Sequence, residues 1–309
     1  MICGFKFDIN FNLERNMKLK LLVAAAIMAA SAPTFAAMDL GTSGNGSLLL
    51  NVRYYNGSAT SGANDISALF DLGVNMNDVI AWNGQSGYSQ TWSLNAASFG
   101  SAWNDLNTFV AANGNAPIEY SVIALDSSNN NTAGGSRYLT TADVATFPAL
   151  VNSSLNGFSN MDAMLVANNG RGTHGTELNG ASTAVYSDPA NTFFGAVGGA
   201  TPGDNWTTKT TADTTKTLVT AQNFWYLTTS TVTGSNQATK TAFGVDLDGD
   251  NVIEASNANG LNEFGEWSVN AAAGTLSYTN PTAVPVPAAA WLLASGLIGM
   301  VGVARRKAA

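Results

Sequence analysis

The chain has 309 residues, of which 45% are hydrophobic and only 11% are charged, and its formal net charge is −8. Between Ala37 and Ala283 there are six basic residues and 19 acidic ones, which gives this stretch a net charge of −13. That balance argues against nucleic acid or anionic lipid as a partner, because both are bound through clusters of Lys and Arg. The one cysteine is Cys3, so disulfides cannot stabilise residues 37–283, and their stability must come from a packed core.

The first predicted element is a secretory signal peptide over residues 1–36. Met17-Lys18-Leu19-Lys20 opens a basic segment, Leu21 to Ala30 is apolar, and Thr34-Phe35-Ala36 offers small residues at the cleavage positions. We expect the secretory translocon to export the chain and cleavage to follow Ala36, with Ala37 as the second choice. The residues before Met17 include acids that do not suit a basic leader, so Met17 is a candidate start of translation.

Residues 37–283 form a single predicted body that is rich in strands. Leu48 to Tyr55 has the apolar and aromatic residues typical of a strand and stops at the turn pair Asn56-Gly57. Ile118 to Leu125 alternates between apolar and polar residues, which predicts a half-buried strand. The further predicted strands are Thr217 to Thr233, Thr241 to Val245, Glu266 to Val269 and Thr275 to Thr279.

Three short helices are predicted between these strands. Ser101 is expected to cap a helix over Ala102 to Ala112, where apolar residues recur every three or four positions and Asn113-Gly114 provides the stop. Thr141 is expected to cap a second helix that ends before Pro148, and Met161 to Ala167 is predicted to form a third. Taken together, the elements predict a mainly β, sandwich-like single domain with a few short helices.

The most specific chemical signal in the body is the acidic segment from Asp246 to Glu254. Carboxylates at alternate positions of a tight loop can converge on one Ca²⁺, which takes six to eight oxygen ligands. The segment resembles the start of an EF-hand or dockerin-type loop, with Asn251 at the sharp turn that such loops usually give to Gly. The predicted metal ligands are the side chains of Asp246, Asp248, Asp250 and Glu254 and the main-chain carbonyl of Val252.

The segment departs from that pattern at its twelfth position. Asn257 stands where the loops place a bidentate Glu, which predicts a weak site, in the millimolar range of extracellular modules. Glu263 is an acid further along that could compensate. The alternative is a solvated acidic turn that binds no cation.

Other residues offer less specific signals. His174 is the sole histidine and lacks the spacing of a zinc or triad site, so an exposed loop residue is expected. Glu263 and Glu266 could form a glycosidase pair, which would fit a secreted enzyme acting on exopolysaccharide. Six tryptophans could form a sugar-stacking platform of a glycan-binding adhesin or could pack in the core. They are Trp82, Trp92, Trp103, Trp206, Trp225 and Trp267.

The C-terminal 26 residues begin with Val284-Pro285-Val286-Pro287-Ala288. Ala288 to Ala304 follows as 17 residues without a charge, at the lower limit for a transmembrane helix, and Arg305-Arg306-Lys307 follows that. The basic cluster predicts a cytoplasmic C-terminus and an exported body, because Lys and Arg stay on the cytoplasmic side. The two prolines predict an extended entry to the helix.

Motif, apolar span and basic cluster together resemble a PEP-CTERM bacterial sorting signal, in the variant whose motif reads Val-Pro-Leu-Pro-Ala. Val286 replaces the Leu of that variant. The resemblance implies recognition by an exosortase, cleavage near the motif, and transfer of the body from the inner membrane to the cell surface or extracellular matrix. It further implies a setting rich in exopolysaccharide. We therefore expect an exported envelope or matrix protein with a structural or binding role.

Overall fold

The structure is a computed structural model, and it describes the body of the chain in eight segments. These are residues 37–54, 66–114, 117–128, 135–142, 160–170, 180–185, 216–230 and 238–283. The predicted signal peptide, the sorting motif Val284 to Ala288, the predicted helix 288–304, His174 and Trp206 lie outside the described residues.

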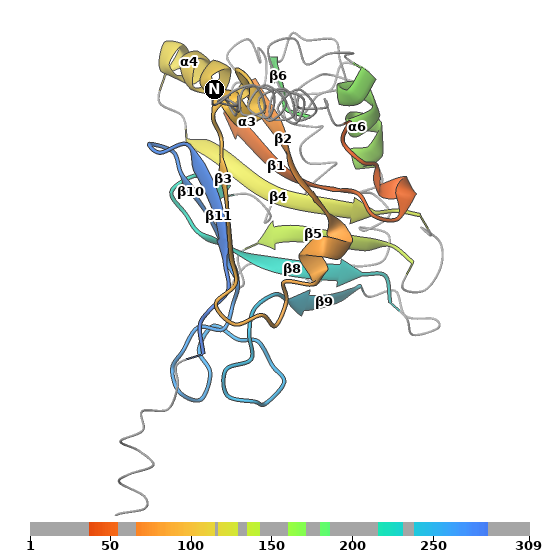
Figure 1. The fold of residues 1–309 in the computed structure, drawn as a ribbon, viewed down its shortest axis with the longest axis vertical. Coiled ribbons are helices and arrows are strands. Elements are labelled where there is room, and N and C mark those ends of the chain that lie inside the picture. The colour runs from red at the N-terminus through yellow and green to blue at the C-terminus, as the bar shows by residue number, and fades with distance from the viewer. Residues whose placement is uncertain are drawn as a thin grey trace, which may run out of the picture.

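The described strands form a strongly curled antiparallel sheet (Figure 1). Their order across the sheet is β3-β11-β10-β8-β5-β4-β1-β2-β6, with β7 beside β4 and β9 beside β8. The strands are β1 (Ser47–Tyr54), β2 (Ile66–Asn75), β3 (Ser89–Ser93), β4 (Ile118–Asp126), β5 (Arg137–Ala142), β6 (Ser182–Val185), β7 (Lys216–Thr217), β8 (Gln222–Thr228), β9 (Thr239–Ala242), β10 (Glu266–Asn270) and β11 (Thr275–Thr279).

Helices cover both faces of this sheet (Figure 1). Besides the 3-10 turn η1 (Gly41–Ser43), they are α2 (Met76–Ile80), α3 (Ala96–Phe99), α4 (Ala102–Asn113) and α6 (Asn160–Gly170). Among the described helices, none is long and apolar enough to cross a bilayer.

Two hydrophobic cores lie on opposite faces of the sheet, because successive side chains of a strand point to opposite sides. In β1, Leu48 and Leu50 belong to the inner core, which is rich in aromatic rings and packs against α3 and α4. Leu49 between them belongs to the outer core, where Met161 and Leu165 of α6 cover the sheet. With both faces buried, the central strands have almost no exposed side chains.

The expectation of a mainly β fold is confirmed, and the strands form a single curled sheet within the described residues. In place of the predicted strand over 217–233 there are two strands, the two-residue β7 and the longer β8, with a turn between them. The predicted helices over 102–112 and 161–167 are present as α4 and α6.

Of the two predicted helix caps, Thr141 is wrong, and Ser101 occupies the N-cap position of α4 without the expected side-chain bond. Thr141 lies inside β5, paired with Phe224 of β8, and its hydroxyl accepts a hydrogen bond from the Val122 amide of β4 at 3.0 Å. Ser101 has helical backbone angles and makes no side-chain cap bond to the backbone. Its hydroxyl donates to the Asp105 carboxylate instead, at 2.6 Å.

Candidate metal site

The acidic segment lies in the long connection from β9 to β10. Backbone contacts hold the start and the end of this connection together. The Val245 amide donates to the Glu263 carbonyl at 2.9 Å, and Gly244 forms a β-bridge with Phe264. This approach requires glycine at 244, because a Cβ there would lie 1.9 Å from the Glu263 carbonyl oxygen. Everything between residues 245 and 263 is thus a closed loop, which lies at the lower end of the body in Figure 1.

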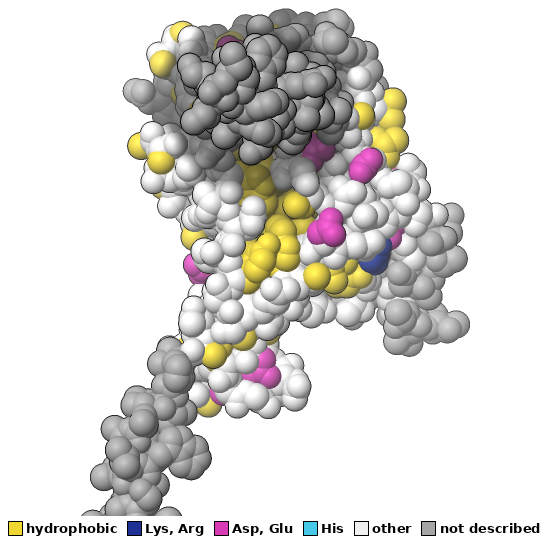
Figure 2. All heavy atoms as spheres, in the orientation of Figure 1, with side chains coloured by type: hydrophobic (Ala, Val, Ile, Leu, Met, Phe, Trp, Pro, Cys, Tyr) yellow, Lys and Arg dark blue, Asp and Glu magenta, His cyan; other side chains and the backbone are white. Residues whose placement is uncertain are grey.

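Three of the predicted ligands converge at the start of this loop. Asp246, Asp248 and Asp250 each present a carboxylate oxygen, and these oxygens lie within 4.8 Å of one another. Asp246 and Asp248 are half-buried and Asp250 is exposed, and Figure 2 shows acidic side chains on the surface of this end of the body. The group is a surface aspartate triad that could hold a metal ion.

Backbone turns set the direction of these carboxylates. Asn251 has φ of +67° and is the one non-glycine residue of the described chain in the left-handed region, as expected for the sharp turn of a calcium loop. Both oxygens of Asp246 accept amide hydrogen bonds across this turn, from Gly249 at 2.6 Å and Asn251 at 2.8 Å. These two bonds hold the pKa of Asp246 below its usual value.

Glu254 and Val252 lie on the same loop. Partial burial of the Glu254 carboxyl, together with the nearby charges of Asp250, Glu263 and Asp248, raises the pKa of Glu254. Its carboxyl therefore shares the electrostatic field of the triad. Val252 is exposed, and its amide donates to the Asp250 carboxylate at 2.8 Å.

Glu263 has a structural role that the sequence did not reveal. It is fully buried, and its carboxylate accepts hydrogen bonds from the Leu247 amide at 2.8 Å and the Glu254 amide at 3.3 Å. A third bond comes from the Asn257 side-chain amide at 2.7 Å. The carboxylate thus ties both sides of the loop together from inside.

Asn257, the residue at the twelfth position of the loop, is likewise engaged within the loop. Its side-chain oxygen accepts the amides of Asn259 at 2.9 Å and Leu261 at 3.0 Å. It therefore closes a local turn instead of facing the triad, and it does not stand in for the bidentate Glu of an EF-hand.

The other candidates from the sequence are placed mainly in the core. Trp82, Trp103, Trp225 and Trp267 are buried, so they do not form an exposed platform, and only Trp92 of the described tryptophans is half-buried. Glu266 accepts a hydrogen bond from the Asn262 side chain at 2.9 Å, while its proposed partner Glu263 serves the loop.

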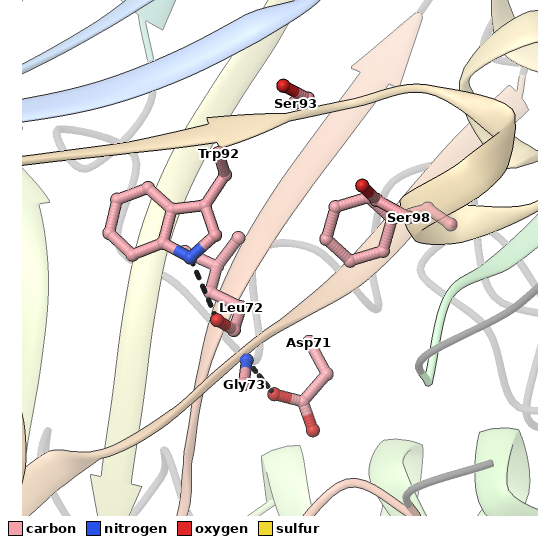
Figure 3. A pocket seen from close by; sticks show the side chains of 7 residues that line it. Asp71, Leu72, Gly73, Trp92, Ser93 and Ser98 are labelled. Atoms are coloured by element: carbon pink, nitrogen blue, oxygen red, sulfur yellow. Dashed lines mark hydrogen bonds between the residues drawn. The ribbon is translucent and has the colours of Figure 1, made fainter. Parts of the chain in front are cut away.

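A second feature, which sequence reasoning missed, is a cavity of about 280 Å³ between β2 and β3. Asp71, Leu72 and Gly73 of β2 line it, together with Trp92 and Ser93 of β3 and Ser98 and Phe99 of α3. Figure 3 shows the Trp92 indole donating to the Leu72 carbonyl, a bond of 2.8 Å.

Comparisons with known proteins give no relative of this chain: no protein-family model, no curated protein and no solved structure matches it.

Proposed function

We propose that the loop from Asp246 to Glu263 binds a Ca²⁺ ion and that this ion stiffens the body of an exported envelope or matrix protein. The main observation in support of this ion is the convergence of the three aspartate oxygens within 4.8 Å around the left-handed turn at Asn251. Three carboxylates so close repel one another, and a divalent cation removes that repulsion. Glu254 and the Val252 carbonyl are the further proposed ligands.

The loop is suited to a structural ion because protein hydrogen bonds hold its frame. The buried Glu263 carboxylate and the bridge at Gly244 fix both ends, so little chain order has to be created when the ion binds. With Asn257 turned inward, the site lacks a bidentate acid, which favours weak binding, of about millimolar affinity.

The loop is also connected to the end of the described chain. The Gly84 amide donates to the Gly244 carbonyl at 2.8 Å, and three residues on, the Gly87 amide donates to the Pro281 carbonyl at 2.9 Å. One turn, residues 82–88, therefore holds both the start of the acidic loop and the residues that lead to the predicted sorting motif. An ion in the loop would stabilise this end of the body.

A calcium titration of thermal unfolding tests the cation site. At a Ca²⁺ concentration ten times the dissociation constant, binding to the folded state adds about 1.4 kcal/mol. For a body of this size that raises Tm by about 3–6 °C. Asp250→Asn should abolish most of the rise, since Asn keeps the acceptor for the Val252 amide but removes a charged ligand. Asp105→Asn on α4 changes an exposed acid outside the loop and should keep the full rise. An unchanged Tm of the unsubstituted protein would refute the site.

The exported setting rests on the two terminal sequence signals and on the acidic, cysteine-free body. It is tested by the intact mass and both termini of the protein recovered from its native host. Cleavage of the signal peptide predicts an N-terminus near Ala37, and exosortase processing predicts a C-terminus near Pro287. An intact end at Arg305-Arg306-Lys307 would contradict processing and leave a membrane-anchored surface protein.

A further inference from the structure

The curl of the sheet brings together two strands that lie near its opposite ends. β3 ends one side of the strand order, and β2 is the second strand from the other side. They are not paired as strands. Their contact includes the 2.8 Å hydrogen bond from the Trp92 indole to the Leu72 carbonyl. The cavity of about 280 Å³ occupies this seam, and Figure 2 shows hydrophobic side chains at the surface between these strands.

The Trp92 indole forms a rigid wall of this cavity. One ring face stacks on Trp267, with centroids 5.5 Å apart and planes 25° apart, and Trp82 packs beside them at 6.1 Å from Trp92. The indole N–H is fixed to the Leu72 carbonyl. Since Trp92 is only half-buried and lines the cavity, its face turned from Trp267 is the one available to a ligand.

The rest of the wall is open at Gly73, and its one carboxylate, that of Asp71, already accepts hydrogen bonds from within the protein. The Asp71 carboxylate is occupied by the Ser47 hydroxyl and the Gly73 amide, both at 2.9 Å, and Figure 3 shows it turned away from Trp92. Nothing lies within 4 Å of a Cβ built at Gly73, so the space above it is free. Ser93, an exposed residue, also lines the cavity, but Figure 3 shows its hydroxyl on the other side of β3 from the Trp92 indole.

A flat aromatic face beside an open rim fits a ligand with an apolar face and a polar edge. The volume lies below that of pockets for drug-sized molecules and suits a single ring. We propose that this seam binds one neutral pyranose ring of a carbohydrate, with its C–H face on Trp92 and its hydroxyl groups toward the open rim at Gly73. The site does not depend on the cation loop.

The test uses the full-length protein in detergent micelles, labelled with 5-fluorotryptophan and titrated with the methyl glycosides of glucose, galactose and mannose. A single-ring ligand of this size predicts a dissociation constant of about 1–10 mM. The fluorine signal of Trp92 should shift and saturate with at least one glycoside. The signal of Trp225, which packs in the outer core, should stay in place and serves as the internal control.

Two matched leucine variants sharpen the test and need no change in the core. Ser98→Leu on α3 places a larger side chain in the lining of the cavity and should weaken binding about fivefold. Ser89→Leu makes the same change at an exposed position of β3 outside the cavity and should leave binding unaltered. The proposal is overturned if Trp92 does not respond to any of the glycosides at about 50 mM, if Trp225 shifts in parallel with it, or if both leucine variants bind alike.

Discussion

Asp71 provides the sharpest test of the energetics of the fold. Its side chain sits on β2, 7% exposed, and accepts hydrogen bonds from the Ser47 hydroxyl and the Gly73 amide. Burial is the largest influence and raises the pKa of Asp71 from 3.8 to about 6, with a smaller contribution from the charge of Asp39, and the two hydrogen bonds only partly oppose this. One pKa unit corresponds to 1.36 kcal/mol, so the shift is equivalent to about 3 kcal/mol.

The sign of the effect follows from proton binding. Between pH 3.8 and about 6 the folded protein keeps the Asp71 proton while the unfolded chain loses it. Stability from this group is therefore complete below about pH 4 and is lost as the pH rises through about 6. Asp71→Asn replaces the carboxyl by a neutral group of the same shape that keeps an acceptor for the Gly73 amide. The variant should lack this loss, so its stability relative to the unsubstituted protein should increase by about 2.4 kcal/mol from pH 4 to pH 7.

Urea unfolding of both proteins at a series of pH values, with a chelator present, measures this difference. The chelator keeps cation binding from adding its own pH dependence, and the acidic loop then contributes equally to both proteins. Parallel stability profiles from about pH 4 to pH 7 would contradict this expectation, because they would mean that Asp71 ionises as freely in the folded protein as in the unfolded chain.

Three further predictions concern the loop and the aromatic core. Gly244→Ala should destabilise the protein by about 3 kcal/mol or more, because its Cβ would overlap the Glu263 carbonyl. Gly249→Ala has free space but a positive φ, so it should destabilise the protein by about 1 kcal/mol. Equal losses of stability in thermal unfolding would contradict this. Glu263→Gln should destabilise the protein by about 2 kcal/mol, because a buried amide nitrogen would replace one acceptor oxygen. Calorimetric titration should show weaker Ca²⁺ binding as well. An unchanged stability would exclude a role of this carboxylate in holding the two sides of the loop together. Trp267→Phe should destabilise the protein less in urea than Trp92→Phe does, because the buried Trp267 indole N–H has no partner while that of Trp92 is bonded. The reverse order would contradict this expectation.

Local pattern was sufficient to predict the strands with clear alternation and the helix α4. The sequence of β4 alternates and that of α4 has an apolar repeat, so both elements could be located from their own segments, but the prediction that β4 is half-buried is wrong, because both of its faces are covered. β5 shows the limit of this approach. Thr141 was expected to cap a helix, but pairing with β8, more than 80 residues later, draws it into the sheet. Such long-range pairing overrides the local conformational preference, and it cannot be predicted from the sequence of the segment alone.

The same distinction applies to the candidate site. The alternation of Asp246, Asp248 and Asp250 and the turn at Asn251 were readable because they depend on neighbouring residues. The inward roles of Glu263 and Asn257 were not, since several acids and amides nearby look equivalent until the fold decides which is buried. The seam at Trp92 was also hidden, because it arises from the curl of the whole sheet.

Anomalous diffraction from crystals grown with CaCl₂ would locate a calcium ion in the loop. A peak is expected between the carboxylates of Asp246, Asp248 and Asp250, with Glu254 and the Val252 carbonyl within coordination distance, about 2.3–2.6 Å. A loop that shows no anomalous peak at a Ca²⁺ concentration of about 10 mM, well above the expected dissociation constant, would contradict it and leave a solvated acidic turn.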